Sequence, residues 1–252
     1  MSPGGDLAVV IPARNESDRI GATVRAAALI PGADILVVVD DGSSDGTGAE
    51  ARVAGATVVR HARTRGKAAA LESGAEAVRV IEAERGTAVP HHLLFLDGDL
   101  GETAAEAGPL AEPVIAGRAD MTIAVFASRV KRGGHGIVIG LSGAGIERAT
   151  GWRPAEPLNG QRCLTRAAFE AARPLAPGWG AETGLTIDLL RKGMRVEEVR
   201  VPLAHRATGK DLRSQVHRAR QLAGVARALA TRRPWRHAAI PPDTLTGQAD
   251  VT

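Results

Sequence analysis

The sequence predicts an α/β protein with a mostly parallel sheet, helices on both faces of the sheet and a helical C-terminal extension. Short runs rich in β-branched residues alternate with longer amphipathic runs through the first half of the chain, which is typical of parallel strands joined by helices. The chain has 252 residues and one cysteine, so an apolar core without internal disulfides must stabilise it. A last amphipathic run near the C-terminus predicts the helical extension.

The first half divides into apolar runs with the length of buried strands and amphipathic runs with the length of crossover helices. A helix candidate lies between each two successive strand candidates, as parallel pairing requires. We expect strands at 7–13, 35–41, 56–62, 92–98 and 121–127, and helices near 17–29, 45–54, 67–84 and 103–117.

The second half contains more helix and begins with a loop. The Gly-rich basic stretch SRVKRGGHG interrupts the alternation and predicts that loop. The length favours a single domain, 1–232, followed by a loosely ordered tail, 233–252. After the loop at 128–136 we expect helices near 137–149, 163–173, 181–193 and 211–231, and a strand at 195–204.

Composition indicates which kinds of partner the protein binds and where in the cell it is located. The chain carries 32 Lys and Arg against 28 Asp and Glu, with only 2% aromatic residues. Because single-stranded nucleic acid is bound by aromatic stacking beside basic residues, we expect no nucleic-acid partner. Anionic small molecules and an anionic membrane surface both fit the charge. With no basic leader, no apolar run of membrane-spanning length and a single Cys163, we expect a cytoplasmic protein, at most peripheral at the inner face of the membrane.

Polar residues follow three of the predicted strands at the point where each strand ends. The carboxyl ends of parallel strands lie at one edge of a sheet, where ligands of α/β proteins bind. This convergence predicts a ligand site. The residues are Arg14, Asn15, Glu16, Asp40, Asp41, Asp97 and Asp99.

The segment FLDGDL places Asp97 and Asp99 one residue apart at the end of a buried strand. Burying such charge is costly unless a cation compensates it, and a divalent ion with oxygen ligands would also bridge a diphosphate. A helix cap followed by a turn aspartate explains the pair equally well at this stage.

Two further segments predict nucleotide contacts. In VVDDGSSDGT much of the polarity is ordinary helix capping, but Asp40 and Asp41 exceed what a cap requires and would accept hydrogen bonds from a base or ribose. In RTRGKAAAL a helix begins at Lys67, so its dipole and the ammonium group would face a phosphate. The segment is not a P-loop, and no GxGxxG follows the first strand, which argues against an NTPase and a dinucleotide-dependent oxidoreductase.

Two residues of the second half add chemistry. Glu182, in GWGAETG, is predicted near a helix start, where a carboxylate serves as a base or as a clamp for an acceptor. His205 follows the last strand and is a candidate metal ligand, although a lone histidine is more often structural.

The ordered motifs VVIPARNE, VVVDDGSSDGT, RGKAAAL and FLDGDL resemble those of family 2 GT-A glycosyltransferases, the group that contains dolichyl-phosphate mannose synthases. Downstream, PLNGQRCLTRAAFE, LAPGWGAETGLTIDLL and PLAHRATG resemble glucosyl-3-phosphoglycerate synthases. The resemblance implies a Rossmann-like GT-A fold, with a nucleotide-sugar half at about 7–127 and an acceptor half at about 128–232. It also implies transfer of a sugar from a UDP- or GDP-sugar, with Mg²⁺ or Mn²⁺, to a small phosphorylated acceptor such as a phosphoglycerate-like molecule or a polyprenyl phosphate.

The same resemblance implies roles for individual residues. The implied catalytic residues are Glu182, Asp99 and Lys67, and the implied metal ligands are Asp99 and His205. Glu182 would act as a base if transfer inverts the anomeric centre, but the two resembled groups differ in stereochemistry, so the outcome stays open. The implied substrate-binding residues are Pro12, Ala13, Glu16, Asp40, Asp41, Lys67, Asp97, Gly98, Asn159, Gly160 and Arg132.

Alternatives of other classes stay open on sequence grounds. A nucleotidyltransferase that makes a nucleotide sugar would also use a carboxylate-bound metal, although no Gly-rich triphosphate loop follows the first strand. A non-catalytic nucleotide-sugar-binding protein is a further alternative. The basic helix at 211–231 would either pack on the core or touch an anionic membrane, and a homodimer is an open expectation.

Overall fold

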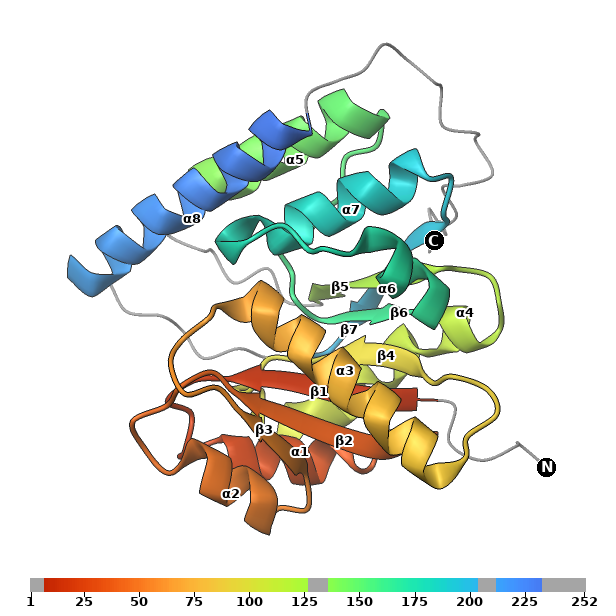
Figure 1. The fold of residues 1–252 in the computed structure, drawn as a ribbon. Coiled ribbons are helices and arrows are strands. Elements are labelled where there is room, and N and C mark those ends of the chain that lie inside the picture. Colours follow the sequence, from red (N-terminus) through yellow and green to blue (C-terminus); the bar gives the residue numbers. More distant parts are fainter. Residues whose placement is uncertain (1–6, 127–135, 204–211, 233–252) are drawn as a thin grey trace.

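The computed structural model describes residues 7–126, 136–203 and 212–232. A seven-stranded sheet crosses the molecule in the order β3-β2-β1-β4-β6-β5-β7 (Figure 1). Neighbouring strands are parallel, except that β6 runs antiparallel to both β4 and β5. Helices cover both faces, which confirms the predicted α/β fold with a mostly parallel sheet.

The first half follows the predicted alternation. Every strand expected there is present, most of them a few residues shorter than predicted. The elements are β1 (Leu7–Ala13), α1 (Ile20–Ala27), β2 (Ala33–Asp40), α2 (Thr47–Val53), β3 (Thr57–Arg60), α3 (Lys67–Arg85), β4 (His92–Phe95) and β5 (Met121–Phe126).

The single helix predicted at 103–117 is wrong. The segment forms a 3-10 helix, η1 (Gly101–Leu110), followed by the short α4 (Glu112–Ile115). Pro109 lies inside η1 and Pro113 lies in the first turn of α4. Because proline has no backbone N–H to donate, one continuous α-helical ladder cannot run through this segment.

The helix predicted near 163–173 is also corrected, because its first residues form a strand. β6 (Arg162–Leu164) pairs on both sides, with β4 and with β5. Thr165 then caps α6 (Arg166–Ala172), accepting a hydrogen bond from the backbone N–H of Ala168 at 3.0 Å. A strand of three residues is too short to produce a periodic signal in the sequence.

The remaining helices and the last strand are where the sequence predicts them. Of the loop predicted at 128–136, all but Gly136 lies outside the described residues, as does the predicted tail at 233–252. The division into a donor half and an acceptor half stays a prediction. None of the described helices is long and apolar enough to cross a membrane. The elements are α5 (Gly136–Thr150), η2 (Gly178–Gly180), α7 (Ala181–Arg191), β7 (Val196–Val201) and α8 (Leu212–Thr231).

Two apolar cores flank the sheet. Alternate residues of β1 belong to different cores: Val10 packs with α3, α6 and α7, whereas Val9 and Ile11 pack with α1, α2 and η1. β1 is therefore buried on both faces, as expected for a central parallel strand. α5 and α8 pack together and against α7 (Figure 1), and Ile146 of α5 belongs to the first of these cores.

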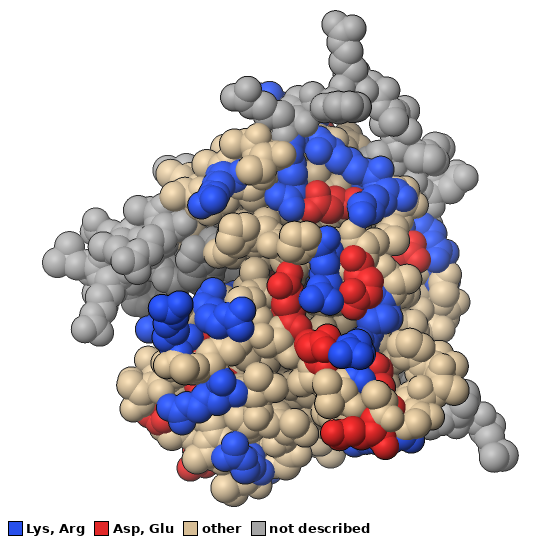
Figure 2. Space-filling view, viewed as in Figure 1, with Lys and Arg blue, Asp and Glu red and all other residues tan. Residues whose placement is uncertain are grey.

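Acidic and basic side chains are interleaved on the face of the molecule that carries α3 and α6 (Figure 2). Ion pairs join neighbours within one helix, as between Arg79 and Glu76, and also join separate elements, as between Arg85 and Asp34. Such exposed pairs add little stability each. The fold therefore depends mainly on its two apolar cores.

Helix α3 packs closely on the sheet at Gly74. A Cβ atom at this position would lie 2.3 Å from Cγ1 of Val10 and 3.2 Å from Cγ2 of Val39. We expect Gly74→Ala to lower stability by about 1 kcal/mol, because overpacking of roughly 1–3 kcal/mol exceeds the gain in helix propensity. Chemical denaturation measures the difference. Gly140→Ala in α5, where the new methyl group meets no atom within 4 Å, is expected to stabilise; a gain in both variants would contradict the close packing at Gly74.

Candidate functional site

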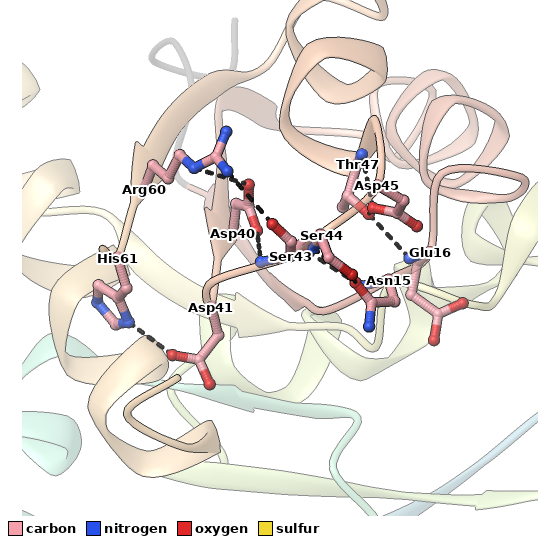
Figure 3. A network of polar contacts seen from close by, with 10 residues as sticks. All are labelled: Asn15, Glu16, Asp40, Asp41, Ser43, Ser44, Asp45, Thr47, Arg60 and His61. Atoms are coloured by element: carbon pink, nitrogen blue, oxygen red, sulfur yellow. Dashed lines mark hydrogen bonds and ion pairs between the residues drawn. The ribbon is translucent and has the colours of Figure 1, made fainter. Parts of the chain in front are cut away.

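The site is built at the carboxyl edge of the sheet, where β1, β2 and β4 end. The loops that follow β1 and β2 are joined by backbone-to-side-chain hydrogen bonds (Figure 3). Asn15 donates its N–H to Ser43 Oγ at 3.0 Å and accepts from the N–H of Ser44 at 2.9 Å, while Glu16 N–H donates to Thr47 Oγ1 at 2.9 Å. Asn15 has a φ of 56°, a left-handed conformation that asparagine tolerates better than most residues. The two loops therefore form one unit.

Asp45 closes this unit from the exposed side. Its carboxylate accepts from Thr47 N–H at 3.0 Å and from Ser17 N–H at 3.3 Å, and also from the Thr47 hydroxyl. Desolvation opposes the charge, but these hydrogen bonds outweigh it and lower the pKa of Asp45 to about 2. The carboxylate is thus ionised wherever the protein is folded near neutral pH.

Asp40 is expected to bind substrate; the structure shows it buried in the loop after β2, and substrate contact stays a prediction. Its side chain has no exposed surface, and its Oδ1 accepts from the N–H of Ser43 at 2.8 Å. Its Oδ2 faces Gly48, where a Cβ atom would lie only 2.8 Å away. Asp40 therefore orders the loop after β2 from within.

Asp41 lies at the start of the loop and holds a second segment. It accepts from the N–H groups of Arg65 at 2.8 Å and Gly66 at 2.9 Å, and its Oδ1 lies 2.7 Å from Nδ1 of His61 (Figure 3). His61 in turn contacts Ser73 in α3, Nε2 to Oγ 3.0 Å. Burial opposes the charge of Asp41, yet the donors outweigh it and lower its pKa. Asp41 therefore fixes the turn that leads into Lys67; direct contact with a base stays a prediction.

Lys67 lies at the centre of the site. Its Nζ is 2.7 Å from Oδ1 of Asp97 and 3.2 Å from Oε1 of Glu182. Burial disfavours the ammonium form, but the two carboxylates outweigh it and raise the pKa of Lys67 well above its ordinary value. The first residue of α3, the end of β4 and the first turn of α7 thus meet in one ionic cluster of three residues that the sequence predicted separately.

The segment before β6 completes the cluster. A Cβ atom at Gly160 would lie 2.1 Å from Nζ of Lys67, so a larger residue would displace the ammonium group from its present position. The next residue, Gln161, donates from Nε2 to Oδ2 of Asp97 at 2.8 Å. Both oxygens of Asp97 are therefore engaged within the protein. Sequence analysis missed Gln161; its only signal was its place directly after the glycine of the NGQ motif.

The side chain of Asn159 bonds within the protein, and its expected contact with substrate stays a prediction. Its Nδ2 donates to the carbonyl of Ala124 at 2.7 Å, and its Oδ1 accepts from the N–H of Gln161 at 3.0 Å. The residue is buried. Asn159 therefore shapes the loop that carries Gly160.

Side chains at the start of α1 bond to the backbone of the acidic segment after β4, residues 98–101. Thr23 Oγ1 donates to the carbonyl of Gly98 at 2.9 Å and accepts from the N–H of Gly101 at 2.8 Å. Arg19 donates to the carbonyl of Asp99 at 3.0 Å. Gly98 packs on Ala13, where a Cβ atom would come within 3.1 Å of the alanine Cβ. The backbone that carries Asp99 is thus fixed, with the residue itself half-buried.

Two expected site residues, His205 and Arg132, lie outside the described residues. Within the described part of the chain, no three His, Cys, Asp or Glu side chains gather in a way that could hold a metal ion. Of the expected nucleoside pocket, Pro12 and Glu16 are half-buried and Ala13 is buried. Contact of these residues with a nucleoside stays a prediction.

The Asp41 network predicts a measurable stability effect. Asp41→Asn removes the charge from hydrogen bonds that three groups make, so we expect a loss of about 1.5–3 kcal/mol at pH 7. Because the folded-state pKa is depressed, ionised Asp41 stabilises the native state above its ordinary pKa, and this contribution disappears as pH falls through the folded value. Urea denaturation from pH 7 to 3 should show the variant and the wild type converging. The exposed Glu106→Gln serves as the control; an Asp41 effect no larger than this control would contradict the network.

Three comparisons place the chain among known proteins. The model of the family described as glycosyl transferase family 2 matches residues 8–137. A glucosyl-3-phosphoglycerate synthase of Mycolicibacterium paratuberculosis is 31% identical over 202 residues, which are 73% of this chain and 60% of that protein. The chain therefore spans less than two thirds of this relative.

Solved structures agree with the sequence comparison. Glucosyl-3-phosphoglycerate synthase from Mycobacterium tuberculosis, in complex with Mn²⁺, UDP and phosphoglyceric acid, is 26% identical, with a TM-score of 0.69 over 91% of this chain and 78% of that one. The same enzyme with Mn²⁺, UDP-glucose and glycerol 3-phosphate is 25% identical, with a TM-score of 0.65 over 91% of this chain and 80% of that one. The ordered motifs, the mixed sheet and the matched family model lead to one conclusion: this chain belongs to glycosyl transferase family 2.

Proposed function

We propose that the chain is a metal-dependent glycosyltransferase that moves glucose from UDP-glucose to a small phosphorylated acceptor of the phosphoglycerate class. The observation that carries the proposal is the cluster in which Lys67 lies between Asp97 and Glu182 at the carboxyl edge of the sheet. This edge is where α/β proteins bind nucleotides. The donor class follows from family membership, and glucose follows from the relatives, which are glucosyl-3-phosphoglycerate synthases.

Lys67 supplies positive charge to the leaving group. Breaking the bond between sugar and nucleotide leaves negative charge on the diphosphate, and a fixed ammonium group stabilises that charge without reorganising solvent. The raised pKa keeps Lys67 charged throughout the neutral pH range. Asp97 and Gln161 hold the ammonium group in place, because Asp97 bonds both to Lys67 and to the side-chain amide of Gln161.

Asp99 and His205 would hold the divalent metal. Asp97 has both oxygens engaged, whereas Asp99 is half-buried at the edge of the site and its backbone is fixed by α1. A carboxylate oxygen and an imidazole nitrogen suit Mn²⁺ or Mg²⁺, and diphosphate oxygens would complete the ligand set. A bound divalent ion supplies positive charge to the departing diphosphate.

Glu182 is the carboxylate that the second half of the chain adds to the Lys67 cluster. Its carboxylate lies in the first turn of α7, where the helix dipole stabilises negative charge. From there Oε1 would accept a hydrogen bond from a hydroxyl of the sugar or the acceptor. It would act as a base only for an acceptor that reacts through a hydroxyl group.

The acceptor assignment depends on the relatives. Their structures are described with phosphoglyceric acid and glycerol 3-phosphate, so a small phosphorylated hydroxy compound is favoured over polyprenyl phosphate. The basic stretch that the sequence predicts as a loop at 128–136 would supply charge of the required sign, with Arg132 as the proposed phosphate contact. Peripheral membrane contact through α8 and a homodimer stay predictions.

A transfer assay tests the proposal. With Mn²⁺, UDP-glucose and 3-phosphoglycerate, we expect release of UDP that depends on the acceptor. UDP with Mn²⁺ should raise the melting midpoint, by about 2.7 kcal/mol of stability at 100 times the dissociation constant. Asp99→Ala should abolish both effects, whereas Glu102→Gln, an exposed acid just beyond the motif, should retain them.

The alternatives give different products in this assay. Release of pyrophosphate from UTP and glucose 1-phosphate would identify a nucleotidyltransferase. Metal-dependent UDP binding without UDP release from any acceptor would identify a binding protein, and no binding at all would overturn the donor assignment.

The close packing of Gly160 on Lys67 predicts a second result. Gly160→Ala forces the ammonium group away from Asp97, so kcat should fall by about 10²- to 10³-fold, as when one charge-stabilising donor is removed. Lys67→Met should give a loss of similar size. Steady-state kinetics at saturating donor measures both variants, with Gly140→Ala as the control. An active Gly160→Ala variant would show that the ammonium position is not needed for transfer.

A further inference from the structure

Arg162, the first residue of β6, is the largest side chain that is fully buried in the described structure, with 1% of its surface exposed. None of the described carboxylates forms an ion pair with it. Burial lowers its pKa to about 10, although Glu182 and Glu198 favour the charged form from a distance. A buried guanidinium is costly unless its N–H groups are all used, so its partners reveal its purpose.

The guanidinium bonds to the loop before β6 and to α7, and its Nη1 also donates to Sδ of Met121 in β5 at 3.8 Å. On one side, Nε donates to the carbonyl of Asn159 at 2.8 Å and Nη2 donates to the carbonyl of Pro157 at 3.2 Å. On the other side, Nη1 donates to the carbonyl of Glu182 at 3.2 Å and to Oγ1 of Thr186 at 2.9 Å. Arg162 therefore ties the loop before β6 to the first turn of α7.

These are the two segments that enclose Lys67 from the second half of the chain. The loop carries Gly160, whose Cα packs on the ammonium group, and Gln161, which bonds to Asp97. The first turn of α7 carries Glu182. No other described side chain bonds to the backbone carbonyls of both segments.

We propose that Arg162 is a positioning residue that sets the separation of Glu182 and Gly160 around Lys67. The proposal rests on the proposed function and deepens it, because it concerns how the same site is held in its reactive geometry. The guanidinium contacts no reacting group itself. Its fork of N–H donors fixes two backbone segments at once, which the single ammonium of a lysine cannot do.

The chain offers a matched control for a merely structural role. Arg166 belongs to the same β6 to α6 segment, is also largely buried, and bonds to Glu82 at 2.9 Å. Glu82 also accepts from His91, which immediately precedes β4. The Arg166 pair therefore lies at the opposite edge of the sheet from Lys67, so its loss should affect stability without affecting the site.

The test compares Arg162→Met, Arg162→Lys and Arg166→Met at a temperature where all variants are folded. We expect Arg162→Met to lower kcat by about tenfold or more, since misplacement by about 1 Å can cost 10²-fold, with little change in the KM for UDP-glucose. Arg162→Lys should recover part of the loss. Arg166→Met should lower the melting midpoint while kcat changes by no more than about twofold.

A milder variant covers the case in which Arg162→Met does not fold. Thr186→Val removes one partner of the guanidinium and should reduce kcat in the same direction, by a smaller factor. If kcat instead falls in proportion to the loss of stability in the Arg162 and Arg166 variants alike, Arg162 is only structural and the proposal is overturned.

Hydrogen exchange separates failure of this proposal from failure of the proposed function. In Arg162→Met, or in Thr186→Val, exchange should accelerate at 157–161 and 181–186 and stay unchanged at 41–47. If the wild type transfers no sugar, the proposed function fails, and the exchange measurement still decides the positioning role. Unchanged exchange at both segments would overturn the proposal even in an active enzyme.

Discussion

Charge neutralisation at one lysine organises the site. Lys67 is placed within 3.2 Å of Asp97 and Glu182, which come from different halves of the chain. Two carboxylates this close would repel each other in a partly dry environment, and the ammonium group removes that penalty. The same ammonium is the group that we propose stabilises the departing diphosphate. The position of Lys67 Nζ therefore matters both for the stability of the cluster and for the proposed function.

The mixed topology of the sheet explains how the second half of the chain reaches this atom. Because β6 runs antiparallel between β4 and β5, its first residue lies at the edge where the parallel strands end. The loop before β6 is thereby brought against Lys67, with Gly160 packed on the ammonium group. A fully parallel strand at this place would start at the opposite edge and leave the cluster open on this side.

The donor side is rigid for a different reason. Its loops are joined by short polar side chains that accept hydrogen bonds from backbone N–H groups. The two consecutive aspartates bond to different segments. Asp40 orders the loop after β2 from within, while Asp41 reaches across to the turn before Lys67. Such fixed dipoles suit a site that must stabilise charge during a reaction, because little reorganisation is needed. This side is therefore set before any ligand arrives.

Local patterns in the sequence determined the fold class, the strands of the first half and the position of most site residues. Apolar periodicity reports burial directly, and Asp97, Lys67 and Glu182 each stand at the end or start of a predicted element. Tertiary structure decided what periodicity cannot encode. β6 is too short to be periodic, Asp40 and Asn159 turn inward, and the roles of Gln161 and Arg162 depend on partners up to 64 residues away. A side chain's partner is fixed by packing across the sheet, because residues distant in sequence meet only when the strand order is set.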